Sequence, residues 1–483
     1  CPRLDMNTFR PSQAQLWSLT EAFTSIMGSS YAKTELRLWS WLGLMSLSIA
    51  GVFALLLAIS RVPNSDQLLS WPIHFFEKGL IIHVIFSFVI WFLSIFSALC
   101  TISTYRLSNG RPRLQSLGYI AIALAVTAFI LLFLSGLMNR GAPSLNNYIP
   151  VIIDPIYYSG LGIFFFSTFL QFFRLIINFF RRRGPFEPVT QAIMVAGILF
   201  LIAIYCFFHS LSLVWGDPID PALNENIFWA SGHVLQFVNT LLMLVSWYIL
   251  GSIIFGQPVI NPKIFSYILW AFLFSGAGLL FLLLSYDPIS AYGREAFTKA
   301  QFLMLPLVLS FFLGFALNLS TLTRNNKFCF SNDPVTLTVC LSMVVFLIGG
   351  FLGLFVDGND TRTPAHYHGV IGGVNIAFIG FFFFFMMPIL RQADTHRSVH
   401  FFLLWCYGVG QILHSLGLFF AGGYGAPRKT PGNLSIIDNI WAEASLYAMG
   451  IGAVIAVLGG VLFIVTAGKM LLNTETETTK SNH

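Results

Sequence analysis

Long apolar stretches recur along the chain, separated by short segments rich in Gly, Pro and charged residues. Each apolar stretch has about 20 or more residues, enough for a helix to cross about 30 Å of hydrocarbon. The pattern predicts twelve membrane-spanning helices, at residues 38–60, 79–103, 115–138, 155–180, 190–215, 227–255, 263–285, 299–323, 335–356, 364–390, 398–421 and 442–470. No segment between them is long enough for a soluble domain. We therefore expect an all-α integral membrane protein, a bundle of twelve transmembrane helices.

The two ends of the chain differ from the bundle in pattern. Residues 12–33 are amphipathic, which favours a helix lying on the membrane surface within an N-terminal segment 1–37. Residues 471–483 are rich in Thr and Glu, which is typical of a disordered tail. The expected organisation is therefore an N-terminal segment, a membrane domain over 38–470 and a short tail.

Composition agrees with a membrane protein and narrows the chemistry. Hydrophobic residues make up 56% of the chain and charged residues only 10%, which excludes an ordinary soluble globular protein. The six cysteines form no CxxC or CxxCH motif, so neither a zinc site nor covalent haem attachment is indicated.

The distribution of basic residues predicts the orientation of the bundle. Of the 26 Lys and Arg residues, 18 fall on the side that carries both chain ends and 8 on the other side. Because basic residues accumulate on the cytoplasmic or matrix side of membrane proteins, we expect both termini to face that side. The basic balance is thus a topology signal and does not indicate nucleic acid as a partner.

Six histidines fall near the ends of predicted spans: His83, His209, His233, His366, His368 and His414. Starts of even-numbered spans and ends of odd-numbered spans lie on the same side, so all six are expected in the outer half of the membrane. One such histidine can simply hydrogen-bond to a neighbouring helix. Six on one side favour haem or metal ligation, because polar side chains within a membrane are costly and usually functional.

His366 and His368 open the tenth predicted span two residues apart. At 100° per residue, their side chains point about 200° apart, toward opposite faces of one helix. They are therefore placed to serve two different groups.

These motifs resemble subunit I of the haem–copper oxidase superfamily, with the cbb-type oxidases and nitric oxide reductases as the nearest members. The likeness is carried by His83 early in the second span, by Trp229-Ala-Ser-Gly-His233, by the segment from His366-Tyr-His368-Gly to Ala377-Phe378, and by Pro388-Ile-Leu-Arg391. It extends over residues 38–470.

The resemblance implies a role for each histidine. His83 and His368 match the two axial ligands of a low-spin haem, and His366 matches the proximal ligand of a high-spin haem. His233 matches the one ligand that the sixth span gives to the non-haem metal. Haem b, one or two per chain and not covalently attached, is the cofactor implied. By charge, Arg428 and Lys429 are the expected partners of a haem propionate.

One part of the family pattern is missing. Family members carry an adjacent His-His pair at the end of the seventh span, where this chain reads Phe281 to Ile289 without a histidine. One imidazole cannot hold copper tightly, so copper or non-haem iron is not expected and His233 is a vestigial ligand. A rebuilt site using His209, Tyr286 or Asp287 stays open as an alternative.

The predicted spans also contain no Asp, Glu or Lys in their inner half. Proton-pumping relatives use acidic or lysine side chains there. We therefore expect no uptake channel of that kind.

The preferred hypothesis is a respiratory-chain electron-transfer subunit that keeps its haems and has lost the non-haem metal, with enzymatic activity undecided. Expected partners are a cytochrome c or haem-c subunit as electron donor, other oxidase-type membrane subunits, and the bilayer of a bacterial or mitochondrial inner membrane. One alternative is an active terminal oxidase or nitric oxide reductase with an unusual metal site. Another is a twelve-helix transporter, which predicts inverted repeats but no outer cluster of histidines.

Overall fold

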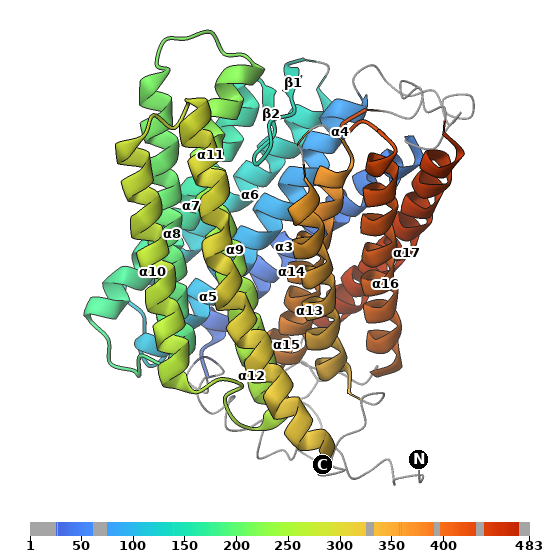
Figure 1. Ribbon diagram of the computed structural model, residues 1–483. Coiled ribbons are helices and arrows are strands. Elements are labelled where there is room, and N and C mark those ends of the chain that lie inside the picture. The colour runs from blue at the N-terminus through green and yellow to red at the C-terminus, as the bar shows by residue number, and fades with distance from the viewer. Residues whose placement is uncertain are drawn as a thin grey trace.

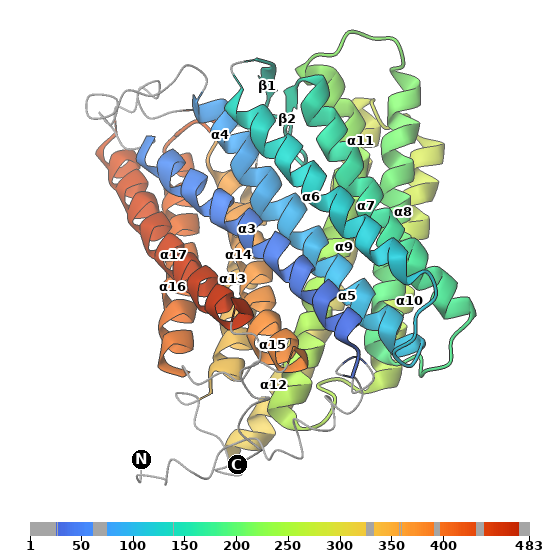
Figure 2. The ribbon, with the colours of Figure 1, turned by 180° about the vertical axis from the view of Figure 1, so that it is seen from behind.

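The computed structural model describes residues 26, 28–60, 75–138, 140–324, 333–356, 358, 360–390, 397–430 and 439–472, and only the backbone of 321–324. In these ranges twelve helical segments are long and apolar enough to cross a membrane, so the predicted number is confirmed. They pack side by side as one bundle (Figures 1 and 2). The elements are α3 (Ser30–Ser60), α4 (Phe75–Val84), η2 (Ile85–Ile90), α5 (Trp91–Leu107), α6 (Gln115–Leu137), α7 (Pro155–Phe180), α8 (Pro188–Leu213), α9 (Pro221–Phe255), α10 (Pro262–Ser285), α11 (Ala291–Ala300), η3 (Gln301–Met304), α12 (Leu305–Arg324), α13 (Pro334–Leu352), η5 (Gly353–Phe355), α14 (Arg362–Phe381), η6 (Phe382–Met386), α15 (Met387–Ile389), α16 (Arg397–Gly423) and α17 (Ile440–Leu472).

Several spans consist of more than one element. The second is α4, η2 and α5 in one continuous rod, the eighth is α11 to α12, and the tenth is α14 to α15. In the second and tenth spans, the middle turns η2 and η6 are π-helical. Such turns rotate the following residues relative to an ideal α-helix, so the faces of these two spans cannot be read from sequence spacing alone.

Four helices begin at an Asp-Pro or Asn-Pro pair. The side chain of the first residue accepts a hydrogen bond from a main-chain N–H in the first turn, and the proline occupies the first helical position, where no N–H is needed. These caps are Asp154 for α7, Asp220 for α9, Asn261 for α10 and Asp333 for α13. The turn signals in the sequence are thus the physical starts of the spans.

A short β-hairpin interrupts the all-helical pattern between α6 and α7. Strands β1 (Ala142–Ser144) and β2 (Val151–Ile153) pair antiparallel at one end of the bundle, which we call the hairpin end (Figure 1). The sequence analysis missed this hairpin because three-residue strands are too short to show an alternating pattern. The hairpin end is also where α4, α7, α9, α11 and α14 begin or lie, as Figures 1 and 2 show.

Glycines bring two helix pairs into backbone contact. A Cβ atom at Gly369 of α14 would lie 2.5 Å from the Cα of Gly349 on α13. A Cβ atom at Gly452 of α17 would lie 2.4 Å from the main-chain nitrogen of His414 on α16. Only glycine permits such approach, so these contacts set the positions of the histidine-bearing helices.

The first span differs from its prediction. It begins at Ser30 rather than at residue 38, so Glu35 lies inside the bundle, fully buried and paired with Arg174 of α7. The expectation of no acidic residue in this half of any span is therefore wrong. A charge can be buried there because an opposite charge and hydrogen bonds compensate its lost hydration. Of the predicted surface helix 12–33, only residues 26 and 28–33 are described, and 30–33 belong to α3. Of the tail 471–483, only 471–472 are described, as the end of α17.

Candidate haem-binding site

His366 and His368 point from α14 toward different helices, as their spacing predicts. The Nδ1–H of His366 donates to the main-chain oxygen of Gly349 on α13, at 2.8 Å. The imidazole of His368 instead lies edge to face with that of His414 on α16, with ring centroids 4.5 Å apart. The prediction that α14 presents one histidine to each of two sites is thereby confirmed as geometry.

Three imidazoles share one hydrogen-bonding arrangement. Nδ1 of His83 lies 2.9 Å from the main-chain oxygen of Ala50 on α3, and Nδ1 of His414 lies 3.1 Å from that of Met449 on α17. His366 is held in the same way. Because a carbonyl oxygen only accepts, Nδ1 carries the proton and Nε2 is left with its lone pair. Metal-bound histidines commonly show this second-shell pattern.

His83 and His368 lie at the same depth on neighbouring helices. The indole N–H of Trp91 donates to the side-chain oxygen of Asn375 at 3.0 Å, which joins the second span to α14. His83 precedes Trp91 by eight residues and His368 precedes Asn375 by seven. At 1.5 Å per residue, both imidazoles stand roughly 10–12 Å from this contact, toward the hairpin end.

Space remains beside these imidazoles. His83, His366, His368 and His414 are only half-buried, although most of the residues around them in α4 and α14 are buried. Gly353 adds room at His366, because a Cβ there would lie 2.5 Å from Nδ1. A basic Nε2, a fixed tautomer and open space are the features that an axial ligand of a porphyrin iron needs.

His233 on α9 is in a different state, with both ring nitrogens hydrogen-bonded. Its Nδ1–H donates to the main-chain oxygen of Trp229 at 2.9 Å, and its Nε2 accepts from the hydroxyl of Tyr148 at 2.8 Å. Tyr148 comes from the loop between β1 and β2, and its ring packs on Gly232, where a Cβ would lie 2.3 Å away. Burial raises the pKa of Tyr148 well above its usual range, so the phenol keeps its proton. His233 itself is 1% exposed, in an aromatic shell completed by Phe297.

The alternative metal ligands lie in separate environments. His209 stacks on Tyr205, with centroids 6.0 Å apart, and Tyr286 packs against Tyr292 at 5.2 Å. Asp287 accepts a hydrogen bond from the main-chain N–H of Ile289 in its own turn. Within the described ranges, no three His, Cys, Asp or Glu side chains converge as a metal site would require.

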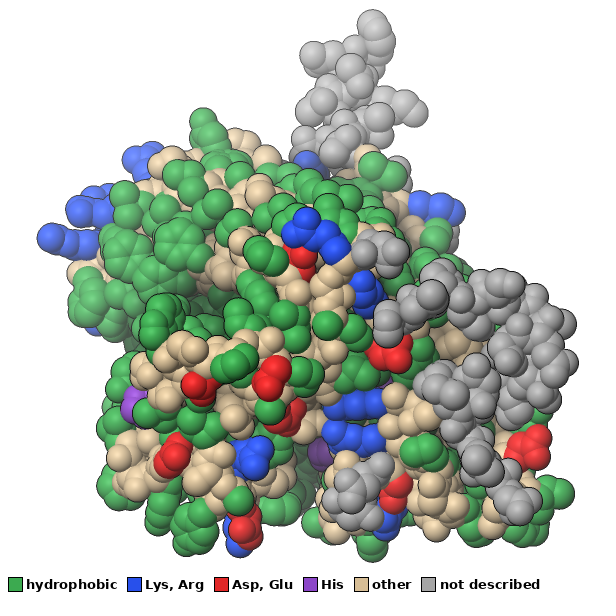
Figure 3. Space-filling view, turned by 90° about the horizontal axis from the view of Figure 1, so that it is seen from above, with side chains coloured by type: hydrophobic (Ala, Val, Ile, Leu, Met, Phe, Trp, Pro, Cys, Tyr) green, Lys and Arg blue, Asp and Glu red, His purple; other side chains and the backbone are tan. Residues whose placement is uncertain are grey.

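A polar network covers the hairpin end above these histidines. Arg428 donates to the side-chain oxygen of Asn147 at 2.5 Å, and Lys429 donates to the main-chain oxygen of Leu145. Asn147 in turn donates to both carboxylate oxygens of Glu225 on α9. Burial, and then the charge of Arg428, lower the pKa of Lys429 to about 8. Figure 3 shows this end, where charged side chains of both signs stand among apolar ones.

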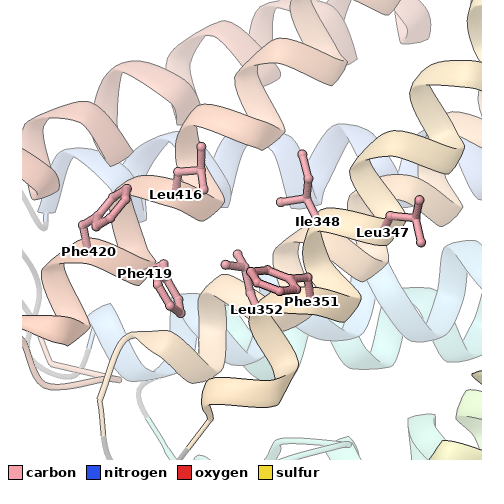
Figure 4. Close-up of a pocket in the computed structure, with 7 residues that line it drawn as sticks. All are labelled: Leu347, Ile348, Phe351, Leu352, Leu416, Phe419 and Phe420. Atoms are coloured by element: carbon pink, nitrogen blue, oxygen red, sulfur yellow. The ribbon is translucent and has the colours of Figure 1, made fainter.

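An apolar hollow lies beside the His366 site, on the membrane-facing surface between α13 and α16 (Figure 4). It offers no polar side chain for ligation or proton transfer, so it is not part of the imidazole cluster. Its lining residues are Leu347, Ile348, Phe351, Leu352, Leu416, Phe419 and Phe420.

Sequence reasoning missed the residues that complete these sites. Tyr148 lies in a loop 85 residues from His233, and Asn375 bonds both to Trp91 and to the hydroxyl of Tyr407. Buried asparagines in a span are a signal that could have been noticed, since they need partners. Nothing in the loop sequence marks Tyr148.

Comparisons with known proteins agree with this geometry. The family model described as cytochrome c and quinol oxidase polypeptide I matches residues 36–462. An uncharacterized protein of Rickettsia prowazekii is 27% identical over 90% of this chain and 95% of its own length. Cytochrome c oxidase subunit 1 of Thermus thermophilus is 20% identical over 80% of this chain and 75% of its own. A heme-copper terminal oxidase dimer solved by cryo-electron microscopy shares the fold, with a TM-score of 0.74 and 17% identity over 92% of this chain and 85% of the solved one.

Proposed function

This chain belongs to the family of cytochrome c and quinol oxidase polypeptide I, subunit I of the haem–copper oxidases, and we propose on that premise that it is a haem-bearing electron-transfer subunit of a respiratory membrane. In this proposal His83 and His368 are the axial ligands of a low-spin haem, and His366 is the proximal ligand of a second, high-spin haem. Haem iron, when bound, takes up and releases one electron at a time.

The observation that carries the proposal is the arrangement around α14. His366 is oriented by α13, and His368 lies toward α16 at the same depth as His83. His83 and His366 each present an Nε2 lone pair toward open space. The protein's part is to fix the tautomers, hold the rings and keep the imidazoles within a largely apolar bundle.

His233 supports the loss of the non-haem metal. In family members this position supplies a metal ligand, whereas here its Nε2 accepts a proton donor, the Tyr148 hydroxyl. A metal ion needs that lone pair, and it needs further donors in a set geometry. Four-electron oxygen reduction and nitric oxide coupling both use the second metal, so we propose electron transfer without that turnover.

Partners and location follow from the same proposal. The hairpin end, where the histidines gather, is the outer side, and the inner side carries most of the basic residues. The electron donor is a cytochrome c or a haem-c subunit at the hairpin end, since this chain has no CxxCH motif. Other oxidase-type membrane subunits complete the assembly, and the membrane is a bacterial or mitochondrial inner membrane.

The test is spectroscopic. Purified protein is measured as a dithionite-reduced-minus-oxidised spectrum before and after carbon monoxide, with pyridine haemochrome quantification and metal analysis. We expect two haems b per chain, one of them shifted by carbon monoxide, and no copper or non-haem iron. H83A should lose the low-spin haem and H366A the carbon monoxide-sensitive one. A protein without haem contradicts the proposal, and stoichiometric copper with oxygen turnover establishes the active oxidase instead.

A further inference from the structure

A buried ion pair joins two helices in the half of the bundle opposite the hairpin. Glu35 of α3 and Arg174 of α7 are both fully buried, with Arg174 Nη2 2.9 Å from Glu35 Oε1. Glu35 lies five residues into its helix, so the pair is roughly 7.5 Å from that end of the bundle. Isolated ionised side chains at this depth are expensive, which makes the pair a candidate for function.

Neighbouring side chains complete the carboxylate's hydrogen bonds. Thr101 of α5 donates to Glu35 Oε1 at 2.8 Å, and the Gln171 amide of α7 donates to the same oxygen at 3.0 Å. The Arg174 guanidinium carbon lies 5.7 Å from the ring centroid of Tyr105 on α5. Glu35 is therefore held as an anion by one cation and two neutral donors.

The same cluster contains buried polar atoms without a partner among the described residues. They are Nε and Nη1 of Arg174, Oε1 of Gln171, and the hydroxyl of Thr104 on α5. Leaving such groups dry costs about 1–3 kcal/mol each, which several groups side by side would multiply. Ordered water is the usual partner of buried polar groups that the protein leaves unsatisfied.

Gly118 of α6 forms part of the wall. A Cβ there would lie 1.7 Å from Arg174 Nη1 and 2.7 Å from Glu35 Oε1, so the fourth helix meets the pair with its backbone. The neighbouring Tyr119 on α6 donates its hydroxyl to the main-chain oxygen of Tyr31 at 3.4 Å. Tyr31 is 58% exposed, so this contact leads from the cluster to the end of the bundle.

Hydroxyls continue from the cluster along α5. Thr104, Thr101, Ser97 and Ser94 are spaced by three, four and three residues, which places them on one face of the helix. All four are buried, and the hydroxyls of Thr104, Ser97 and Ser94 have no partner in the described structure. One face of a membrane helix thus carries a row of hydroxyls that its neighbours do not satisfy.

This row leads toward the histidines. Trp91 lies one turn beyond Ser94 and donates to Asn375, whose amide donates to the hydroxyl of Tyr407 at 3.1 Å. Asn375 is two turns from His368 along α14, on the same face. Polar groups therefore extend from Glu35 to the depth of Asn375.

We propose that the Glu35–Arg174 cluster is a water-binding site at the inner end of a proton route, which runs along α5 to the haem held by His83 and His368. Each water or hydroxyl accepts one proton and passes on another, so a proton enters from the inner side when an electron reaches the haem. The negative charge of the added electron is thereby compensated. The inference rests on the proposed function for its haem, but the water site does not.

A purely structural ion pair is the competing explanation. It accounts for the contacts of Glu35 with Arg174, Thr101 and Gln171, which join α3, α5 and α7. It does not account for unpartnered hydroxyls that continue away from the pair along α5. Under that explanation, removing those hydroxyls should be neutral or slightly stabilising.

The water site is tested by hydroxyl-radical labelling of the whole protein with X-ray radiolysis and mass spectrometry. Cys100 lies on the hydroxyl-bearing face of α5, and Cys206 lies on α8, which contributes nothing to the cluster. Both are 0% exposed. Radicals formed from bound water should oxidise Cys100 several times faster than Cys206. Equal, slow oxidation of the two thiols would show a dry cluster and overturn the site.

The route is tested by proton uptake on photochemical haem reduction, followed with a pH dye. S94A/S97A should lower the uptake rate about tenfold or more, as loss of a proton-transfer group does elsewhere. S46A is the matched control, because the Ser46 hydroxyl is buried but donates to Gly43 in its own helix at 2.7 Å. Unchanged uptake in S94A/S97A overturns the route. Haem is quantified in every sample first, so a chain without haem contradicts the proposed function while the labelling experiment still decides the water site.

Discussion

At the scale of single residues, the histidines of this protein fall into two states. His83, His366 and His414 each use Nδ1 on a main-chain oxygen and remain half-buried, whereas His233 uses both nitrogens and is 1% exposed. The first state keeps a lone pair ready for a ligand. The second satisfies the imidazole within the protein, as a core histidine requires.

The Tyr148 hydroxyl should therefore be a stabilising contact. Y148F leaves His233 Nε2 buried without a donor, which should cost about 1–3 kcal/mol of folding stability. The apparent melting temperature in detergent should fall, and the metal content should stay unchanged. In Y148F/H233F neither polar group remains, so much of the loss should be recovered. Copper bound to wild type and lost from H233F would contradict this role.

Lys429 should give the haem a pH-dependent potential. Its pKa of about 8 lies below the usual value near 10.4, so the side chain loses its charge as pH rises through the alkaline range. A propionate beside it would raise this pKa, placing the transition at or above pH 8. Because positive charge favours the reduced haem, the midpoint potential should fall through the transition.

Spectroelectrochemical titration at successive pH values measures this step. K429M should remove the step and lower the potential measured at neutral pH. K299M is the control, since Lys299 is 72% exposed and pairs with Glu295 on α11. A step that persists unchanged in K429M would assign it to another group.

At the scale of elements, α13 and α14 are held together by their backbones. Gly349 meets Gly369 and also supplies the oxygen that orients His366. One glycine thus sets both the distance between the helices and the tautomer of a ligand. Packing and site geometry are coupled at this contact.

G349A should separate the two helices. Its Cβ would lie 2.3 Å from the main-chain nitrogen of Val370, so overpacking should cost about 1–3 kcal/mol and displace His366. The measurement is melting temperature together with the carbon monoxide-sensitive haem per chain, both of which should decrease. G350A on the same helix is the matched control, because no atom lies within 4 Å of a Cβ there. Equal behaviour of the two variants would refute the coupling.

At the scale of the whole molecule, twelve spans place the hairpin end and the opposite end on the two sides of a membrane. Trp215 is 79% exposed just after α8 at the hairpin end, and Arg181 is exposed just before α8 at the other. These two positions bracket one span. They report the orientation of the entire bundle.

Single cysteines at these positions should label asymmetrically. In intact cells, a membrane-impermeant maleimide should reach W215C, whereas R181C should react only after the membrane is opened. The parent chain under the same conditions gives the background from its own cysteines. The reverse pattern would place the hairpin end inside and contradict the orientation proposed from the basic residues.

The sequence by itself determined the membrane class, the twelve spans and the opposite directions of His366 and His368. These features are local, because hydrophobic length and helical periodicity follow from consecutive residues. The tertiary structure decided what each polar side chain meets. Tyr148 reaches His233 from 85 residues away, and Arg174 reaches Glu35 from 139 residues away. Whether a buried imidazole or carboxylate is satisfied depends on partners from other helices, which only the folded bundle brings together.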